Sequence, residues 1–173
     1  MRRALSLLLA AGFVLGVAAP VAAARDEPSI VDIASGSPDF EILTAAVGAA
    51  GLAGTLDGNR QFTVFAPTDD AFLALEAACP GILGTLLGDT TALTNVLLYH
   101  VAPGAREAAD VVEADRIRML NRQFADVSVD GGAWIDGARI VATDIDTRNG
   151  VIHVIDSVLV PDGLPSTVLA TCG

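Results

Sequence analysis

Lysine is absent from this 173-residue sequence, and all ten of its basic residues are arginines. Aspartate and glutamate together number 21, which leaves a formal net charge of −11. Because an acidic surface repels nucleic acid and anionic lipid, we expect neither as a partner. Long apolar runs are also lacking beyond the first 24 residues, and no later segment is long enough to span a bilayer. The mature chain is therefore not expected to insert into a membrane.

Cysteine is scarce as well, since Cys79 and Cys172 are the only two in the chain. In an oxidising compartment, a lone pair of cysteines forms a disulfide more readily than a metal site. The bridge would close a long loop, which is worth on the order of 4 kcal/mol in the chain-entropy model. A disulfide is the favoured interpretation, with a metal site as the alternative.

Catalytic motifs are missing from the sequence too. Ser157 lies beside Asp156 without the Gly-x-Ser-x-Gly elbow that exposes a nucleophilic serine. The acidic pair Asp69 and Asp70 has no third carboxylate or histidine nearby in sequence to complete a metal shell. We therefore expect no enzymatic activity, no cofactor and no metal.

An export signal is the first feature that the sequence does contain. Arg2 and Arg3 precede an apolar stretch that ends in small residues, the pattern of a secretory signal peptide over residues 1–24. We predict cleavage near Ala23 or Ala24, which gives a secreted protein in an extracellular or periplasmic compartment. An uncleaved membrane anchor is the alternative. Loss of the two signal arginines would take the net charge from −11 to −13.

The most informative segment is NGVIHVIDSVLVP, residues 149–161. Aliphatic and β-branched residues between an Asn-Gly turn and a proline are typical of a strand. Because side chains alternate along a strand, Ile152 would face one side and Ile155 the other, and both apolar faces must be covered. Two polar residues in the segment, His153 and Asp156, should therefore be hydrogen-bonded inside the core.

Helices are expected mainly in the first half of the chain and short strands in the second, which is an α+β pattern. One helix is predicted to start at Thr68, which follows a strand over residues 61–67 and can cap exposed backbone amides. Asp69 and Asp70 in the first turn would be stabilised by the helix dipole. A metal or acid–base role for this acidic pair is the alternative interpretation.

Three stretches follow one another in a specific order, FTVFAPTDDAF at residues 62–72, LLYHV at residues 97–101 and the strand at residues 149–161. Together they resemble the two conserved boxes and the tyrosine-histidine motif of the fasciclin (FAS1) domain family, over the chain from about Ser29 to Pro161. The resemblance implies one domain over residues 25–173, built as a wedge of two β-sheets with helices packed on one side. It also implies that the first and last stretches pair as adjacent central strands, and it implies no catalytic machinery.

The tyrosine-histidine motif of the family falls on Tyr99 and His100, which are the candidate binding residues. His100 lies near a segment end before Pro103, so an exposed binding role and a structural role both stay open. The leading hypothesis is adhesion to a cell surface or extracellular matrix through a protein or glycan, by a monomer or weak dimer. The alternative is an extracellular carrier of a small molecule or metal, with a pocket between the sheets and the helices. A large apolar cavity lined by Tyr99, Met119 or Trp134 would favour the carrier, and a flat acidic face with no cavity would favour adhesion.

Overall fold

Two strands whose residues are all buried form the centre of the molecule. β1 (Phe62–Pro67) and β7 (Gly150–Ile155) run parallel, with Phe62 opposite Gly150 and Pro67 opposite Ile155. This confirms the predicted pairing of the two segments. The computed structural model describes residues 27–172, and the expected signal peptide with its cleavage site lies outside them.

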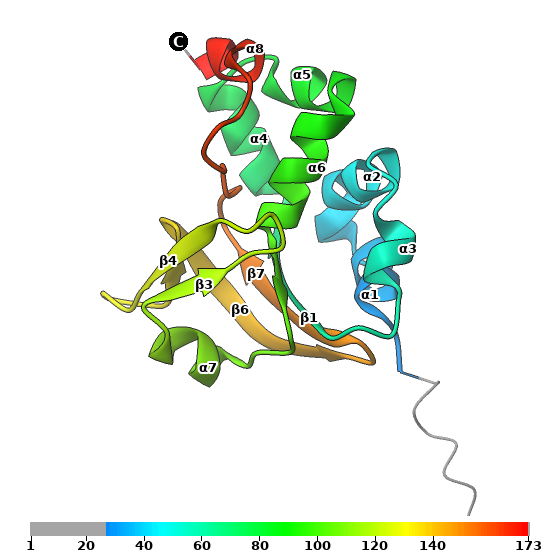
Figure 1. Cartoon of the computed structure of the whole chain (residues 1–173), viewed down its shortest axis with the longest axis vertical. Helices are drawn as coiled ribbons and strands as arrows, with labels where there is room; N and C mark the ends of the chain where they lie inside the picture. The colour runs from blue at the N-terminus through cyan, green and yellow to red at the C-terminus, as the bar shows by residue number, and fades with distance from the viewer. Residues whose placement is uncertain (1–26, 173) are drawn as a thin grey trace, which may run out of the picture.

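Helices dominate the first half of the chain and strands the second. The helices are α1 (Ile30–Gly36), η1 (Pro38–Phe40), α2 (Glu41–Ala49), α3 (Ala53–Leu56), α4 (Asp69–Ala78), α5 (Ile82–Gly88), α6 (Thr90–Tyr99), α7 (Ala108–Glu113), α8 (Ser166–Leu169) and η2 (Ala170–Cys172). The other strands are β2 (Val101–Pro103), β3 (Arg116–Arg118), β4 (Phe124–Ser128), β5 (Trp134–Ile135) and β6 (Ala138–Thr147). Most helices gather on one side of the strands, whereas α7 lies at the opposite end (Figure 1). The expected α+β class is confirmed.

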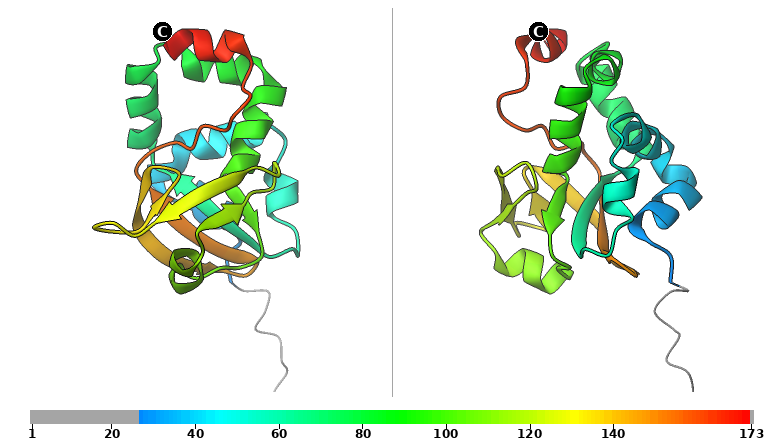
Figure 2. Two further views of the ribbon diagram at one scale, coloured as in Figure 1. Left: turned by 60° about the vertical axis from the view of Figure 1, so that its left-hand side comes forward. Right: turned by 45° about the vertical axis from the view of Figure 1, so that its right-hand side comes forward.

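The seven strands form one continuous sheet in the order β2-β1-β7-β6-β5-β4-β3. β1 and β7 are parallel, and the other neighbouring strands are antiparallel. The sheet curls until its ends meet, because Leu120 just past β3 donates its backbone N–H to the Val101 carbonyl of β2 at 2.7 Å. The two sheets of the expected wedge are therefore two arms of one curled sheet (Figure 2).

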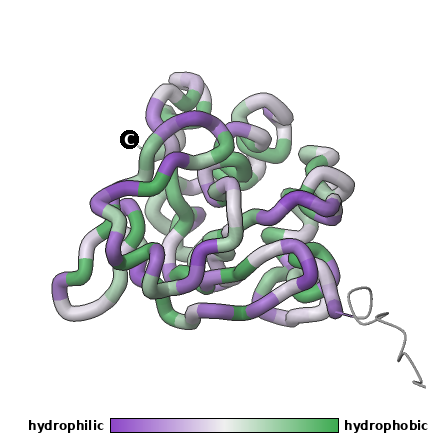
Figure 3. The backbone as a smooth tube through the Cα atoms, turned by 60° about the horizontal axis from the view of Figure 1, so that its bottom comes forward, coloured by the Kyte–Doolittle hydropathy of each residue, from purple (hydrophilic) through white to green (hydrophobic). Residues whose placement is uncertain are grey.

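Two clusters of buried apolar side chains fill the molecule. One lies between the helices and the central strands and contains Ile152 and Val154 of β7. The other is enclosed by the curled sheet and contains Phe65, Ile155 and Leu159. Neighbouring β7 residues thus belong to different clusters, which confirms the predicted alternation of faces. Hydrophilic and hydrophobic segments alternate along much of the chain (Figure 3).

The last strand is shorter than the sequence predicts. β7 ends at Ile155 and does not continue to near Pro161. Its parallel neighbour β1 ends at Pro67, where the chain turns into α4, so beyond Ile155 only β6 remains alongside, and the Asp156 N–H donates to the Arg139 carbonyl at 3.1 Å. Asp156 lies in a bend and is exposed, and the expectation that it is buried in the core is wrong. Its carboxylate accepts the Arg139 backbone N–H at 2.9 Å, which holds the bend against β6.

The carboxyl-terminal segment returns to the helices after β7. α8 lies beside α5 at the top of Figure 1. Cys172 in η2 is joined to Cys79, which follows α4, with an S–S distance of 2.09 Å. The structure therefore contains the disulfide favoured from the sequence, and it links the end of the chain to the helical half of the domain.

Candidate functional site

The tyrosine-histidine pair lies at the junction between α6 and β2. Tyr99 ends the helix, His100 is its C-cap residue and Val101 begins the strand. The exposed fraction is 4% for Tyr99 and 2% for His100, so neither side chain is placed to touch a macromolecular partner directly. The hypothesis of an exposed His100 is wrong because both side chains turn inward and bond to segments that pack over the junction.

Tyr99 belongs to the cluster enclosed by the curled sheet. Its hydroxyl lies 2.9 Å from Asp136 Oδ2 and 3.2 Å from the Phe124 carbonyl oxygen. Burial raises the pKa of the Tyr99 phenol, and the hydrogen bond to Asp136 raises it further. The phenol stays protonated and ties the start of β4 to the turn between β5 and β6.

His100 connects α6 to the segment that follows β7. Its Nδ1 donates to the Val96 carbonyl at 2.8 Å, and its Nε2 accepts the Leu159 N–H at 2.9 Å. This pattern requires the neutral imidazole, and burial lowers the pKa of His100 from 6.5 to about 4. Both ring nitrogens are hydrogen-bonded, so the side chain links α6 to the segment that follows β7.

His153 is a core histidine, as predicted, with no exposed surface. Its Nε2 lies 2.9 Å from the Arg106 carbonyl, to which it donates, and its Nδ1 accepts the Asp144 N–H at 3.3 Å. Burial lowers the pKa of this imidazole below its usual value. The ring also packs against Phe65, with centroids 5.6 Å apart.

A metal shared by the two histidines has no support in these contacts, because all four ring nitrogens are already hydrogen-bonded. Within residues 27–172, no group of three or more His, Cys, Asp or Glu side chains is arranged to hold a metal ion. The two cysteines are joined in the disulfide.

The residues around the start of α4 have different roles. Thr68 Oγ1 accepts the Ala71 N–H at 3.3 Å, which is the predicted cap. Asp69 reaches across to α2, where its carboxylate accepts the N–H groups of Ile42 at 2.9 Å and Glu41 at 3.3 Å. Asp70 is exposed. The acidic pair is thus a helix-terminus feature, and Asp69 also caps α2, a contact that the sequence does not identify.

Asn149 is a structural residue that sequence reasoning treated as part of a turn. The side chain is buried, its Oδ1 accepts the Ile30 N–H at 3.0 Å and its Nδ2 donates to the carbonyls of Leu56 and Gly58. It therefore fastens α1 and the end of α3 to the start of β7. The sole sequence signal is an asparagine directly before a mostly apolar strand, all of whose residues are buried.

Two apolar cavities lie on the helical side of the sheet. The first has a volume of about 180 Å³ and is bounded by α1, α2, α3 and the strands β1, β2 and β7. The second, of about 410 Å³, lies among α2, α4, α5 and α6. His100 contributes to the walls of both. Neither contains Tyr99, Met119 or Trp134, so the predicted lining is wrong because Tyr99 and Met119 fill the other cluster.

An exposed face on the β3–β4 hairpin is a second feature that the sequence did not suggest. Arg118 is paired directly with Phe124 across the two strands, and the Arg116 guanidinium carbon lies 5.3 Å from the centre of the Phe124 ring. Phe124 is 53% exposed, and both arginines are exposed. Arg122 in the connecting turn is exposed as well. We call Arg116, Arg118, Arg122 and Phe124 the hairpin face.

The helices give no single membrane-crossing candidate in the described part of the chain. α4 and α5 meet the length and composition criteria only when taken together, and they are bent by 105° with respect to each other.

Comparison with known proteins identifies a family to which most of the chain is similar. The sequence model of the fasciclin domain family matches residues 38–161 of this chain. Protein sll1483 of Synechocystis sp. is 39% identical over 142 residues, which cover 81% of this chain and 77% of that protein. Transforming growth factor-beta-induced protein ig-h3 of Sus scrofa is 34% identical over 134 residues, or 77% of this chain and 19% of that much longer protein.

A solved structure shares the fold. It is a FAS1 domain pair from the insect cell adhesion molecule Fasciclin I, with a TM-score of 0.67 and 17% sequence identity. The match covers 78% of this chain and 51% of that chain.

Proposed function

This chain belongs to the fasciclin domain family, and from that membership we propose that it is a secreted, non-enzymatic adhesion protein that binds a protein or glycan of a cell surface or extracellular matrix. A protein with the same fold is described as an insect cell adhesion molecule, which supports this proposal. Export would depend on the predicted signal peptide, and mass spectrometry of the exported protein tests its cleavage near Ala23 or Ala24. An intact amino terminus would contradict this part of the proposal.

The hairpin face is the surface that we propose contacts the partner. Arginine and aromatic side chains together are typical of the residues that dominate binding energy at protein interfaces. An arginine stacked on an aromatic ring is also held in position before a partner arrives, so less side-chain freedom is lost on binding. This face replaces Tyr99 and His100, which are buried, as the proposed contact site.

The hairpin face concentrates arginines, with the exposed Asp126 directly opposite Arg116 across the two strands. Residues 116–128 contain three of the ten arginines and a single acidic residue, Asp126, in a chain of net charge −11. In the described residues the one salt bridge joins Arg148 to Asp57, so none of the hairpin guanidinium groups is neutralised in this way. We propose that the partner presents carboxylate or other anionic groups to these arginines, and that the protein acts as a monomer or weak dimer.

A retention assay with charge-reversed variants tests this assignment. The purified mature protein is incubated with cells or matrix of its source, and the bound fraction is measured for Arg116→Glu, Arg118→Glu and the matched control Arg60→Glu. Arg60 is exposed and precedes β1. We expect at least a tenfold loss of retention for the hairpin variants at unchanged thermal stability, and little change for the control. Equal retention of all three variants and the wild type would contradict the assignment.

A further inference from the structure

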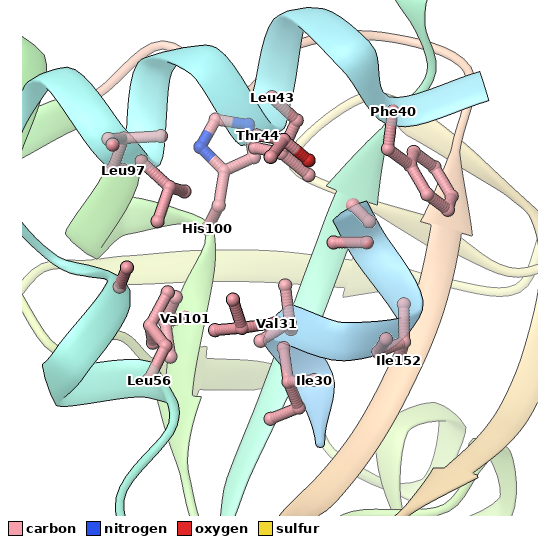
Figure 4. A pocket seen from close by; sticks show the side chains of 16 residues that line it. Ile30, Val31, Phe40, Leu43, Thr44, Leu56, Leu97, His100, Val101 and Ile152 are labelled. Carbon is pink, nitrogen blue, oxygen red and sulfur yellow. The ribbon is translucent and has the colours of Figure 1, made fainter. Parts of the chain in front are cut away.

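The cavity bounded by α1, α2, α3 and the central strands has walls suited to an uncharged ligand. It is lined by 16 residues without a single ionisable carboxylate or guanidinium group (Figure 4). Its one histidine, His100, is neutral and has both nitrogens engaged by the protein. A charged ligand would lose its hydration there without gaining a counter-ion, which is strongly unfavourable.

One polar atom in this cavity has no partner. Thr44 Oγ1 in α2 is buried from water and makes no hydrogen bond within the described residues. A threonine inside a helix commonly bonds to the carbonyl of the preceding turn, which this hydroxyl does not do. A buried hydroxyl left unsatisfied costs about 1–3 kcal/mol. A ligand would satisfy it once the Thr44 side chain rotates and turns Oγ1 toward the cavity, an interaction that the empty protein lacks. Figure 4 shows this hydroxyl among apolar side chains of the cavity wall.

We propose that this cavity binds a small neutral ring compound with one hydroxyl group, such as a phenol or a monocyclic alcohol, and that the hydroxyl is held by Thr44. The size supports this class, because an apolar protein cavity of about 150 Å³ binds benzene, and this one measures about 180 Å³. An apolar wall with one oriented polar group is the usual design of a small-molecule site.

The cavity can be entered between the helices that bound it. Among its lining residues, Gly48 is exposed, and Val31, Thr44 and Ala53 are half-buried. A Cβ atom added to Gly48 would meet nothing within 4 Å, so this position tolerates a larger side chain without backbone strain. A leucine at this position should obstruct the entrance.

Paired ligands that differ in one hydroxyl test the proposal. We would titrate the mature protein with p-cresol and with p-xylene, in which a methyl group replaces the hydroxyl, by calorimetry and by NMR of the cavity methyl groups. We expect p-cresol to bind one-to-one and at least tenfold more tightly than p-xylene. Absence of p-cresol binding, or equal affinities for the two compounds, would overturn the proposal.

Three variants assign the binding to the cavity. Thr44→Val should lower the affinity for p-cresol at least tenfold and leave p-xylene nearly unchanged, whereas Thr44→Ser should keep the preference. Thr91→Val makes the same chemical change at an exposed position of α6 and should alter neither affinity. Gly48→Leu should weaken both ligands. Binding of p-cresol that survives both Thr44→Val and Gly48→Leu would place the ligand elsewhere and overturn the proposal.

Discussion

Asp69 and Asp70 are neighbours in sequence but differ in what they contact. Both lie in the first turn of α4, where the helix dipole favours a negative charge. Asp69 alone also accepts two backbone N–H groups from the start of α2. Those amides have no partner within their own helix, so Asp69 performs the work of an N-cap for a helix distant in sequence.

We therefore predict that Asp69→Ala lowers the free energy of unfolding by about 1–2 kcal/mol, the usual loss for a capping residue. Asp70→Ala removes the same charge from the same turn without a cap and should cost less than about 1 kcal/mol. Urea denaturation of both variants measures the difference. Equal losses would show that the contact between α4 and α2 adds nothing to stability.

The Asn149 side chain makes hydrogen bonds to three residues elsewhere in the chain, in addition to its place in a turn. Replacement by alanine would leave the Ile30 N–H and the carbonyls of Leu56 and Gly58 without their partner. Since each buried unsatisfied group costs about 1–3 kcal/mol, we predict that Asn149→Ala lowers the free energy of unfolding by at least about 2 kcal/mol. The exposed Asn59, changed to alanine, is the control in the same denaturation experiment. A matching urea midpoint for both variants would refute this role.

The carboxyl-terminal helices α8 and η2 are short, and they are held by the fully buried Val168 and by the disulfide. The Cys79–Cys172 bridge spans 93 positions of sequence. A closed loop of that size restricts the unfolded chain, so we predict that Cys79→Ser combined with Cys172→Ser lowers the free energy of unfolding by about 4 kcal/mol. Thiol titration of the denatured, unreduced wild type should find no free thiol. Addition of a reductant should destabilise the wild type but not the double variant.

Sequence reasoning located most elements because their signals are local. The strand at β1, the cap at Thr68 and the passage from α6 into β2 follow from side chains close together in the chain. The end of β7 was missed because it depends on where β1 stops, which is a tertiary fact. The cross-helix contact of Asp69 and the bonds of Asn149 depend in the same way on segments far apart in sequence.

The candidate site was less predictable than the fold. Tyr99 and His100 were singled out by a motif, but a motif does not report whether its side chains face solvent. Burial was settled by packing against Asp136 and Leu159, which lie 37 and 59 residues away in sequence. The hairpin face also depends on a pairing, since Arg118 and Phe124 meet only when β3 and β4 are in register.

The two halves of the molecule differ in how tightly they are packed. The cluster enclosed by the curled sheet contains Phe65, Met119 and Ile155, each almost fully buried, while both apolar cavities lie on the helical side. Buried histidines lie on both sides of this division, because His153 packs against Phe65 whereas His100 lines the cavities. Protonation of His153 would therefore disturb the part enclosed by the sheet, and protonation of His100 would disturb the helical side.

We predict that global stability falls as the pH is lowered from about 6.5 toward 4. His100 has a pKa of about 4 in the folded protein against 6.5 as a reference, so in this window the unfolded chain binds a proton that the native state does not. The contribution of His100 is complete above pH 6.5, and integrated over the window its loss is on the order of 3 kcal/mol. The lowered pKa of His153 acts with the same sign.

Urea unfolding at a series of pH values measures this loss, and His100→Gln should show a shallower pH dependence than the wild type. Two carboxylates with lowered pKa values, Asp32 and Glu76, give stability that is lost only as the pH falls below their reference values of 3.8 and 4.5. Their effect therefore follows that of the histidines on acidification. A flat free energy of unfolding between pH 7 and 4.5 would mean that the buried imidazoles can be protonated without loss of the fold, contrary to the hydrogen bonds that each ring makes in its neutral form.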